Sequence, residues 1–312
     1  MALKIDNEVV KTAMSEVLMQ NIDNFNAGTN GAISLSTEYI KGDAEEFSGL
    51  AEIANIIARR DPTVDTPAAV KNIDSIDANN IKVYFGTGAI EFKLVDAERY
   101  GSDSDAFSMA IGEQIGVGLI NFMLNQGISA AVGALGSNTN IIVGDGTADV
   151  SFSFLNDGLA KFGDASKNLV SWVMTGNQYH KLMGDAIANY NIDSVTGGAI
   201  QTGTTASLGR PVFVTDSAGL GGVATGEAIL GLTAGALRLA ETSARQIYNE
   251  IVTGNENLKY RIQAESDVLL RVLGYSYIGP ANPLTGDLEA TTNWNKVATD
   301  DKATAGILVN VA

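Results

Sequence analysis

The sequence of 312 residues contains no cysteine, so a disulfide framework, a thiolate metal site and a cysteine nucleophile are all excluded. It contains one histidine, His180, which excludes a histidine-rich metal site. Prolines number only 5 against 34 glycines, a ratio that predicts many turns and loops around a core. The absence of cysteine suits a reducing compartment and also a bacterial cell surface, so the compartment stays open.

Basic residues are also scarce, with 20 Lys and Arg against 36 Asp and Glu and a net charge of -16. Such a surface repels phosphate, which excludes a tight nucleic-acid binder but not a container for DNA. Hydrophobic residues make up 45% of the chain and charged residues 18%, which is typical of a globular protein with one large or two intermediate domains. The start, Met1–Asp6, lacks the basic and apolar regions of a signal peptide.

One segment is long enough to need a membrane test. No charged residue lies between Glu113 and Asp145, and Ile115–Leu135 is largely apolar. Polar residues such as Asn121 and Gln126 interrupt this run, and no lysine or arginine flanks it closely. The sequence therefore predicts a buried helix and no membrane partner.

No motif in the chain supports catalysis. His180 has no Gly-x-Ser-x-Gly elbow to serve, so it is interpreted as a polar residue on a helix face. Asp145–Asp149 lacks the spaced ligands of a calcium loop and is interpreted as a turn. Gly86-Thr87-Gly88 and Gly219–Gly222 match no nucleotide-binding fingerprint. We therefore predict no catalytic, cofactor-binding or metal-binding residues, no cofactor, and a protein that is not an enzyme.

Periodicity predicts the elements of the first half of the chain. Apolar residues recur at helical spacing in Val9–Leu18 and in Glu45–Ala58, with an extended or flexible arm at Asn21–Ser36 between them. Ile81–Phe85 and Ile90–Leu94 alternate in polarity on either side of Gly86-Thr87-Gly88, which predicts a two-stranded hairpin with charges on one face. A long helix begins at Ala106 behind a cap at Ser104 or Asp105 and continues towards Leu135, and Gly112 and Gly116 would allow close packing.

The second half contains the most informative stretch. Leu169–Met174 is predicted to be a buried strand, which turns at Thr175-Gly176-Asn177 into a helix that begins at Gln178. Gly209–Asp216 supplies a second strand after the loop Val195–Ser207. Further elements are predicted as a strand at Val150–Phe154, a helix at Asn156–Phe162, and strands at Ile141–Val143, Ala228–Leu232, Leu237–Ala240, Leu258–Tyr277 (broken near Glu265) and Ile307–Val311.

This order of elements resembles the major capsid proteins of tailed double-stranded DNA bacteriophages, which have the Hong Kong 97-type fold. The resemblance covers essentially the whole chain, with motifs that are family-like. Its best points are Trp172-Val173-Met174 with Tyr179 and Leu182, Gly209-Arg210-Pro211-Val212, Gly274-Tyr275-Ser276-Tyr277, and Asn282-Pro283 followed by Asn293-Trp294.

The resemblance implies an α+β fold with four parts. Residues 1–48 would be the N-terminal arm, and residues 59–103 the extended hairpin loop that reaches across a neighbouring subunit. The peripheral domain would combine 49–58, 104–153 and 258–312 around a long spine helix, and 154–257 would be the axial domain. If the loop lies outside the core, deleting Ile73–Tyr100 should abolish assembly and leave a folded subunit.

The resemblance also implies a structural subunit that assembles with itself, in pentamers and hexamers, into an icosahedral shell around DNA. Scaffolding, portal and decoration proteins would be further partners, and DNA would be enclosed without tight sequence-specific binding. The location would be the virion capsid, assembled in the cytoplasm of the host bacterium. The alternatives are a secreted bacterial surface or filament protein, an encapsulin-like compartment that encloses protein cargo, and a hydrolase that uses two close carboxylates.

Overall fold

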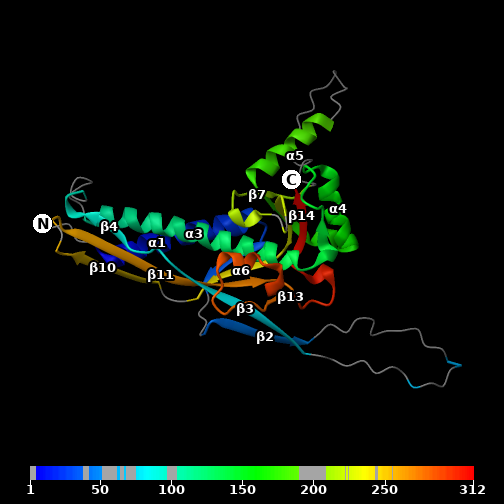
Figure 1. Cartoon of the computed structure of the whole chain (residues 1–312), viewed down its shortest axis with the longest axis horizontal. Coiled ribbons are helices and arrows are strands. Elements are labelled where there is room, and N and C mark those ends of the chain that lie inside the picture. Colours follow the sequence, from blue (N-terminus) through cyan, green and yellow to red (C-terminus); the bar gives the residue numbers. More distant parts are fainter. Residues whose placement is uncertain are drawn as a thin grey trace.

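The computed structural model describes residues 5–37, 42–50, 62–63, 67, 75–96, 104–189, 209–221, 223, 225–242, 245–254 and 256–312. Figure 1 shows an elongated limb of strands and two helices, which joins a wider body on the right of the view. The helix α3 (Ser104–Gly136) runs from the limb into the body and connects them. The predicted loop Val195–Ser207 lies outside the described residues.

The larger sheet is built around one long strand, β11 (Lys259–Val272). Its other strands are β1 (Ile33–Thr37), β2 (Ala44–Leu50), β3 (Ser75–Gly86), β4 (Ile90–Lys93), β9 (Leu237–Glu241) and β10 (Gln246–Val252). The strand order is β1-β9-β11-β3-β2, and β10 and β4 also pair with β11 further along it. Tyr260, Ile262 and Ala264 are buried in alternation along β11, as expected when one face of a sheet packs on a core.

Two helices cover the core face of the limb. The helix α1 (Asn7–Gly28) packs along α3, and it buries Val10, Met14 and Leu18 at helical spacing. The two helices approach closely at Gly112, where an added Cβ would lie 2.5 Å from the carbonyl oxygen of Val10. The small residues that the sequence spaces four apart on α3 therefore serve a close helix crossing.

The body contains a five-stranded sheet in the order β5-β14-β8-β6-β7. Its strands are β5 (Ile142–Val143), β6 (Leu169–Met174), β7 (Val212–Val214), β8 (Glu227–Thr233) and β14 (Gly306–Val311). The helices of the body are α4 (Phe152–Phe162), α5 (Gly176–Asn189) and the short α6 (Thr285–Glu289), and a two-stranded sheet joins β12 (Tyr275–Tyr277) to β13 (Trp294–Lys296). Short 3-10 helices lie at Thr139–Ile141, Gly163–Asn168, Ala218–Leu220, Thr291–Asn293 and Asp301–Ala303.

The most informative stretch of the sequence is confirmed in the body. Leu169–Met174 is the strand β6, the helix α5 follows it, and β7 lies parallel beside it with Trp172 paired to Val212. Trp172 is completely buried in this sheet. The predicted strands at Ala228–Leu232 and Ile307–Val311 are also confirmed, as β8 and β14.

The predicted hairpin of Ile81–Phe85 with Ile90–Leu94 is wrong. Both segments pair with β11, and both run antiparallel to it, so the chain continues in one direction through Gly86-Thr87-Gly88. The antiparallel partner of β3 on its other side is β2, with Ala44 opposite Ile81. The alternation of polarity correctly predicted strands, but their partner is β11, which lies at least 166 residues further along the chain at every pair from Ile81↔Leu270 to Lys93↔Lys259.

Other local predictions also need correction. Residues 44–50 form the strand β2 rather than the start of a helix, and 51–58 lie outside the described residues. The arm predicted at Asn21–Ser36 is helical as far as Gly28 and then forms most of β1. The helix α4 begins at Phe152, inside the strand predicted at Val150–Phe154, because Ser151 caps it by accepting a hydrogen bond from the backbone of Phe154. The strand β11 is continuous through Glu265.

Candidate assembly surface

The residues that suggested chemistry in the sequence do not form a common site. Trp172 is buried in β6, whereas His180 is exposed on α5, where its ring meets that of Tyr179 at 5.6 Å in an edge-on contact. His180 is therefore a polar residue on a helix face, as predicted. Within the described residues, no group of three or more His, Asp or Glu side chains is placed to hold a metal ion.

The glycine-rich segment Gly86–Gly88 and the acidic segment Asp145–Asp149 are held by hydrogen bonds within the chain. Thr87 bridges the step from β3 to β4, because its hydroxyl oxygen accepts a hydrogen bond from the backbone of Ala264 at 3.0 Å, and its own N–H donates to the carbonyl of Ala264 at 2.9 Å. Asp145 accepts hydrogen bonds from the hydroxyl and the backbone of Thr147, which lowers the pKa of its carboxyl group. Both segments are short connections whose direction is fixed by hydrogen bonds within the chain.

The helix α3 is long and apolar enough, by length and composition, to cross a membrane over Asp105–Gly136. However, 61% of its most apolar window is buried inside the molecule, against α1, the limb sheet and α6. Gly133 packs so closely on the body that an added Cβ would lie 2.1 Å from the carbonyl oxygen of Leu288. The helix α3 is therefore a largely buried helix of the fold, which packs on both the limb and the body.

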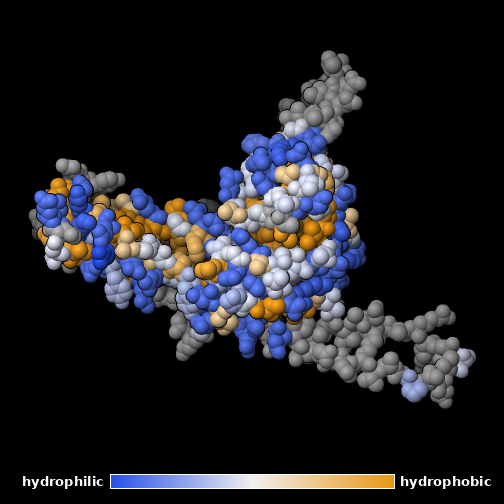
Figure 2. Space-filling view, viewed as in Figure 1, coloured by the Kyte–Doolittle hydropathy of each residue, from blue (hydrophilic) through white to orange (hydrophobic). Residues whose placement is uncertain are grey.

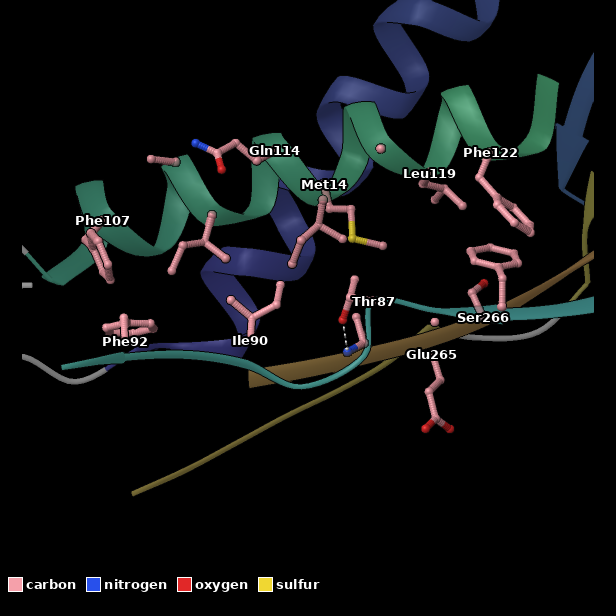
Figure 3. Close-up of a pocket in the computed structure, with 17 residues that line it drawn as sticks. Met14, Thr87, Ile90, Phe92, Phe107, Gln114, Leu119, Phe122, Glu265 and Ser266 are labelled. Carbon is pink, nitrogen blue, oxygen red and sulfur yellow. Dashed lines mark hydrogen bonds between the residues drawn. The ribbon is translucent and has the colours of Figure 1, made fainter. Parts of the chain in front are cut away.

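The same helix leaves an apolar groove open on the limb. The groove lies between α3 and the strands β3, β4 and β11, has a volume of about 640 Å³, and receives Met14 from α1 (Figure 3). This volume is within the usual range for ligand pockets. The remaining residues that line it are Phe85, Gly86, Thr87, Ile90, Phe92, Phe107, Ala110, Ile111, Gln114, Ile115, Gly118, Leu119, Phe122, Ala264, Glu265 and Ser266.

An aromatic pair closes each end of this groove. Phe92 and Phe107 meet at one end with ring centroids 5.2 Å apart, and Phe85 and Phe122 meet at the other end at 4.8 Å. Between these pairs the wall includes small residues such as Gly118, whose Cβ position has no atom within 4 Å. The space is therefore a defined slot, with rigid ends and an open middle.

The groove contains almost no charge. Glu265 is the one ionisable residue that lines it, and Figure 3 shows its carboxylate directed away from α3. Hydrophobic surface is visible along the limb in Figure 2, bordered by hydrophilic side chains. On a protein with a net charge of -16, an uncharged slot of this kind suits an apolar protein segment better than an anionic ligand.

A buried ion pair stiffens the sheet that forms the floor of the groove. Lys82 of β3 lies 2.6 Å from the carboxylate of Asp267 of β11, and both side chains are less than a tenth exposed. The hydroxyl of Thr242, directly after β9, donates to the other oxygen of Asp267 at 2.7 Å. Tyr84, on the same strand as Lys82, donates a hydrogen bond from its hydroxyl to the carboxylate of Asp43, which raises the pKa of Tyr84 to about 12. Three strands are therefore joined by charge-assisted bonds that are costly to break.

Sequence reasoning did not identify the groove. The sequence does contain a pattern related to the groove. Apolar residues at helical spacing make one face of α3 apolar, namely Phe107, Ile111, Ile115 and Phe122. The same spacing is produced by a fully covered core helix, so the sequence could not show that part of this face stays open. The structure shows it because α3 and the strands below it leave a slot between the two aromatic pairs, lined by small residues such as Gly118.

A protein-family model gives the clearest comparison with known proteins. The model described as Gp13-like, major capsid protein 13-like, matches residues 2–308 of the chain. Among curated protein sequences, none matches the chain. The family match spans the limb and the body together, so it concerns the complete arrangement of elements and not one motif.

Solved structures share the fold at low sequence identity. The chain is similar to a structure titled Mycobacterium phage Adephagia, with a TM-score of 0.50, 9% identity, and coverage of 91% of this chain and 90% of that one. It is also similar to Microbacterium phage Oxtober96, with a TM-score of 0.49, 12% identity, and coverage of 92% and 91%. A structure titled Cyanophage Pam1 capsid asymmetric unit matches with a TM-score of 0.49, 11% identity, and coverage of 78% and 87%.

Proposed function

The chain belongs to the major capsid protein 13-like family, and we propose that its copies close into an icosahedral shell of pentamers and hexamers around double-stranded DNA. The protein is a structural subunit of a bacteriophage capsid and not an enzyme, as the resemblance implied. The match of the family model to residues 2–308 carries this conclusion. The alternatives of a surface or filament protein and of an encapsulin-like compartment are not favoured.

The shape and the sheet edges of the subunit support assembly from copies of itself. The limb extends away from the body, so the body does not cover most of its length (Figure 1). Among the described strands, β10 pairs only with β11, and Tyr248 and Ile251 on this strand are exposed. A strand edge with exposed apolar residues is a hazard in a free protein but a natural contact in a shell.

We retain the division into parts as a proposal. The N-terminal arm would be 1–48, the extended loop 59–103, the axial domain 154–257, and the peripheral domain the segments 49–58, 104–153 and 258–312. The described part of β2 ends at Leu50, opposite Ser75 of β3, and this pairing favours a loop that begins before residue 59. The continuous helix α3 fits the spine of the peripheral domain.

The net negative charge of the subunit supports a shell that encloses DNA without binding it tightly. With 36 acidic against 20 basic residues, an inner wall would repel DNA phosphates and leave the packaged DNA mobile. Scaffolding, portal and decoration proteins are proposed as further partners, with assembly in the cytoplasm of the host bacterium. The membrane is not proposed as a partner, because the apolar helix α3 is largely buried inside the molecule.

Negative-stain electron microscopy tests the proposed function. Purified subunits, alone or produced together with the scaffolding protein of the same phage, should form closed shells of uniform diameter. Monomers under every assembly condition would overturn the proposal, and linear filaments or flat sheets would favour the surface-protein alternative. Shells that contain an enzyme and no DNA when isolated from the host would favour the encapsulin-like alternative.

A further inference from the structure

We propose that the apolar groove of the limb is the receptor for an exposed apolar loop, Ile278–Leu284, of a second copy of the chain. This inference rests on the proposed function, since it names one of the contacts through which copies assemble. The groove is the slot already defined between α3 and the strands β3, β4 and β11. The occupant is the segment that connects β12 to α6 in the body.

The loop exposes two large apolar side chains. Leu284 is 76% exposed, which is the highest value among the large hydrophobic residues that the structure describes, and Ile278 is 60% exposed. A single exposed apolar side chain needs no explanation, but two large ones within one short loop favour a contact with a partner. The groove has room for more than one side chain of this size.

The loop is held rigidly, so its side chains are ready to insert. Its ends are fixed because the N–H of Ile278 donates to the carbonyl of Asn293 at 2.9 Å, and the N–H of Leu284 donates to the carboxylate of Asp287 at 2.9 Å. Pro280 and Pro283 restrict the backbone between these anchors. A preorganised loop loses little conformational entropy on binding, which favours its use as a contact.

Low charge favours this loop as the occupant. No charged residue occurs from Val272 to Gly286, and the nearest carboxylate that follows, Asp287, accepts a hydrogen bond from the N–H of Leu284. The groove is lined by one ionisable residue, Glu265, whose carboxylate is directed away from α3. Two copies with a net charge of -16 repel each other, and contact costs least where the surfaces carry few carboxylates.

The loop and the groove are different surfaces of one chain, so their contact is heterologous. Each copy then offers its loop to one neighbour and its groove to another, and such contacts close into rings when the rotation between copies permits. This arrangement suits a shell that is built from repeated copies of one subunit. It would also explain why the described residues leave a slot with aromatic pairs at its ends unfilled.

Single cysteines test the contact directly, because the natural chain has none. Subunits with Leu284→Cys are mixed with subunits with Gln114→Cys, which lies at the mouth of the groove, and are treated during assembly with a short thiol-specific cross-linker. We expect a covalent dimer in the mixture and little or none with either variant alone. The matched control replaces Leu284→Cys by Met19→Cys, an apolar residue that is 70% exposed on α1. Absence of the mixed dimer, or equal yield with Met19→Cys, would overturn the inference.

Filling the groove gives an independent test. Gly118→Leu adds an apolar side chain at a lining position whose Cβ would have no atom within 4 Å, and it removes a glycine from a helix, so the subunit should stay folded. We expect loss of closed shells on negative-stain grids. Gly184→Leu on α5, another exposed helical glycine with open space around its Cβ position, should assemble as the natural chain does.

The outcomes separate this contact from the proposed function. If the natural chain forms no shells, the proposed function fails. If the natural chain forms shells and Gly118→Leu forms them equally well, only the groove contact fails. If Gly118→Leu blocks assembly but Leu284→Cys gives no dimer with Gln114→Cys, the groove binds a different partner, such as a scaffolding protein, and the proposed occupant is wrong.

Discussion

At the scale of single residues, two glycines on the same helix should respond in opposite ways to alanine. Gly118 faces open space, so Gly118→Ala should raise the free energy of unfolding by about 0.5–1 kcal/mol through helix propensity alone. Gly112 faces α1, where an added Cβ would lie 2.5 Å from the carbonyl oxygen of Val10. Gly112→Ala should therefore lower the free energy of unfolding by about 1–2 kcal/mol, because overpacking outweighs propensity.

Urea unfolding of the unassembled subunit, followed by circular dichroism, measures both values. The pair serves as its own control, since both substitutions add one methyl group to α3. Equal stabilisation by the two alanines would show that α1 does not cross α3 closely at Gly112, and the description of the limb would need revision.

Asp301 is a residue whose effect should depend on pH. Burial alone would raise the pKa of its carboxyl group, but hydrogen bonds from Lys296, Asn138 and Asn140 outweigh burial and lower it. Because the pKa is lower in the folded state, the carboxylate stabilises the fold above its ordinary pKa of 3.8, and this contribution is lost as the pH falls below that value.

Asp301→Asn should therefore lower the free energy of unfolding at pH 7 by about 1–2 kcal/mol, since bonds to a charged acceptor become bonds to a neutral one. The difference from the natural chain should shrink as the pH is lowered from about 4 to 2. Asp157→Asn, at an exposed carboxylate on α4, is the matched control and should change stability by less than about 0.5 kcal/mol. A constant difference at every pH would contradict the assignment of the effect to the charge of Asp301.

At the scale of elements, the stretch from β6 to β7 was predictable because its signals are local. An apolar run, a turn and a helix follow one another in Leu169–Asn189, and the second strand needs only to lie beside the first. Arg210 fixes this pairing through hydrogen bonds to the carbonyl oxygens of Leu169 and Ser166, at 2.6 and 2.9 Å. Partial burial lowers the pKa of its guanidinium group. The predicted strand Gly209–Asp216 included Arg210, whereas β7 covers only Val212–Val214, and the sequence could not show these bonds.

The strands β3 and β4 show where local signals stop being sufficient. Two alternating runs around Gly86-Thr87-Gly88 are typical of a hairpin, and nothing near them indicates another partner. The partner is β11, which is long enough to pair with both runs in succession, at Glu265–Leu270 and at Lys259–Ile262. Pairing over such a sequence separation is set by the tertiary fold, so local pattern cannot specify it.

The groove was unpredictable for a related reason. The apolar face of α3 indicates that something covers it, but not whether the cover comes from the same chain or from a neighbour. Packing of α1 fills one side of α3 through Val10 and Met14, while the floor below Gly118 remains open. An apolar face that the monomer leaves partly uncovered is the expected signature of a protein that completes its packing by assembly.

At the scale of the whole molecule, the structure changes the expectation for deleting Ile73–Tyr100. The deletion would remove β3, which lies between β11 and β2 and buries Ile81 and Val83 in the core. It would also leave Asp267 without Lys82, and an unpaired buried charge costs about 3–5 kcal/mol. Together with the lost core residues, this cost is comparable to the whole stability of a domain, about 5–15 kcal/mol. The deleted chain should therefore fail to fold, contrary to the prediction from sequence.

A different excision separates assembly from folding. Leu50 of β2 and Ser75 of β3 lie opposite each other in the ladder, so a short turn can join them in place of residues 51–74. Replacing 51–74 by Asn-Gly, a tight turn suited to antiparallel strands, should leave the thermal unfolding midpoint of the subunit within a few degrees. If the replaced segment joins neighbouring subunits, the same variant should form no closed shells by negative-stain microscopy. Shells that form normally would show that the segment is not an assembly contact, whereas an unfolded variant would show that it belongs to the core.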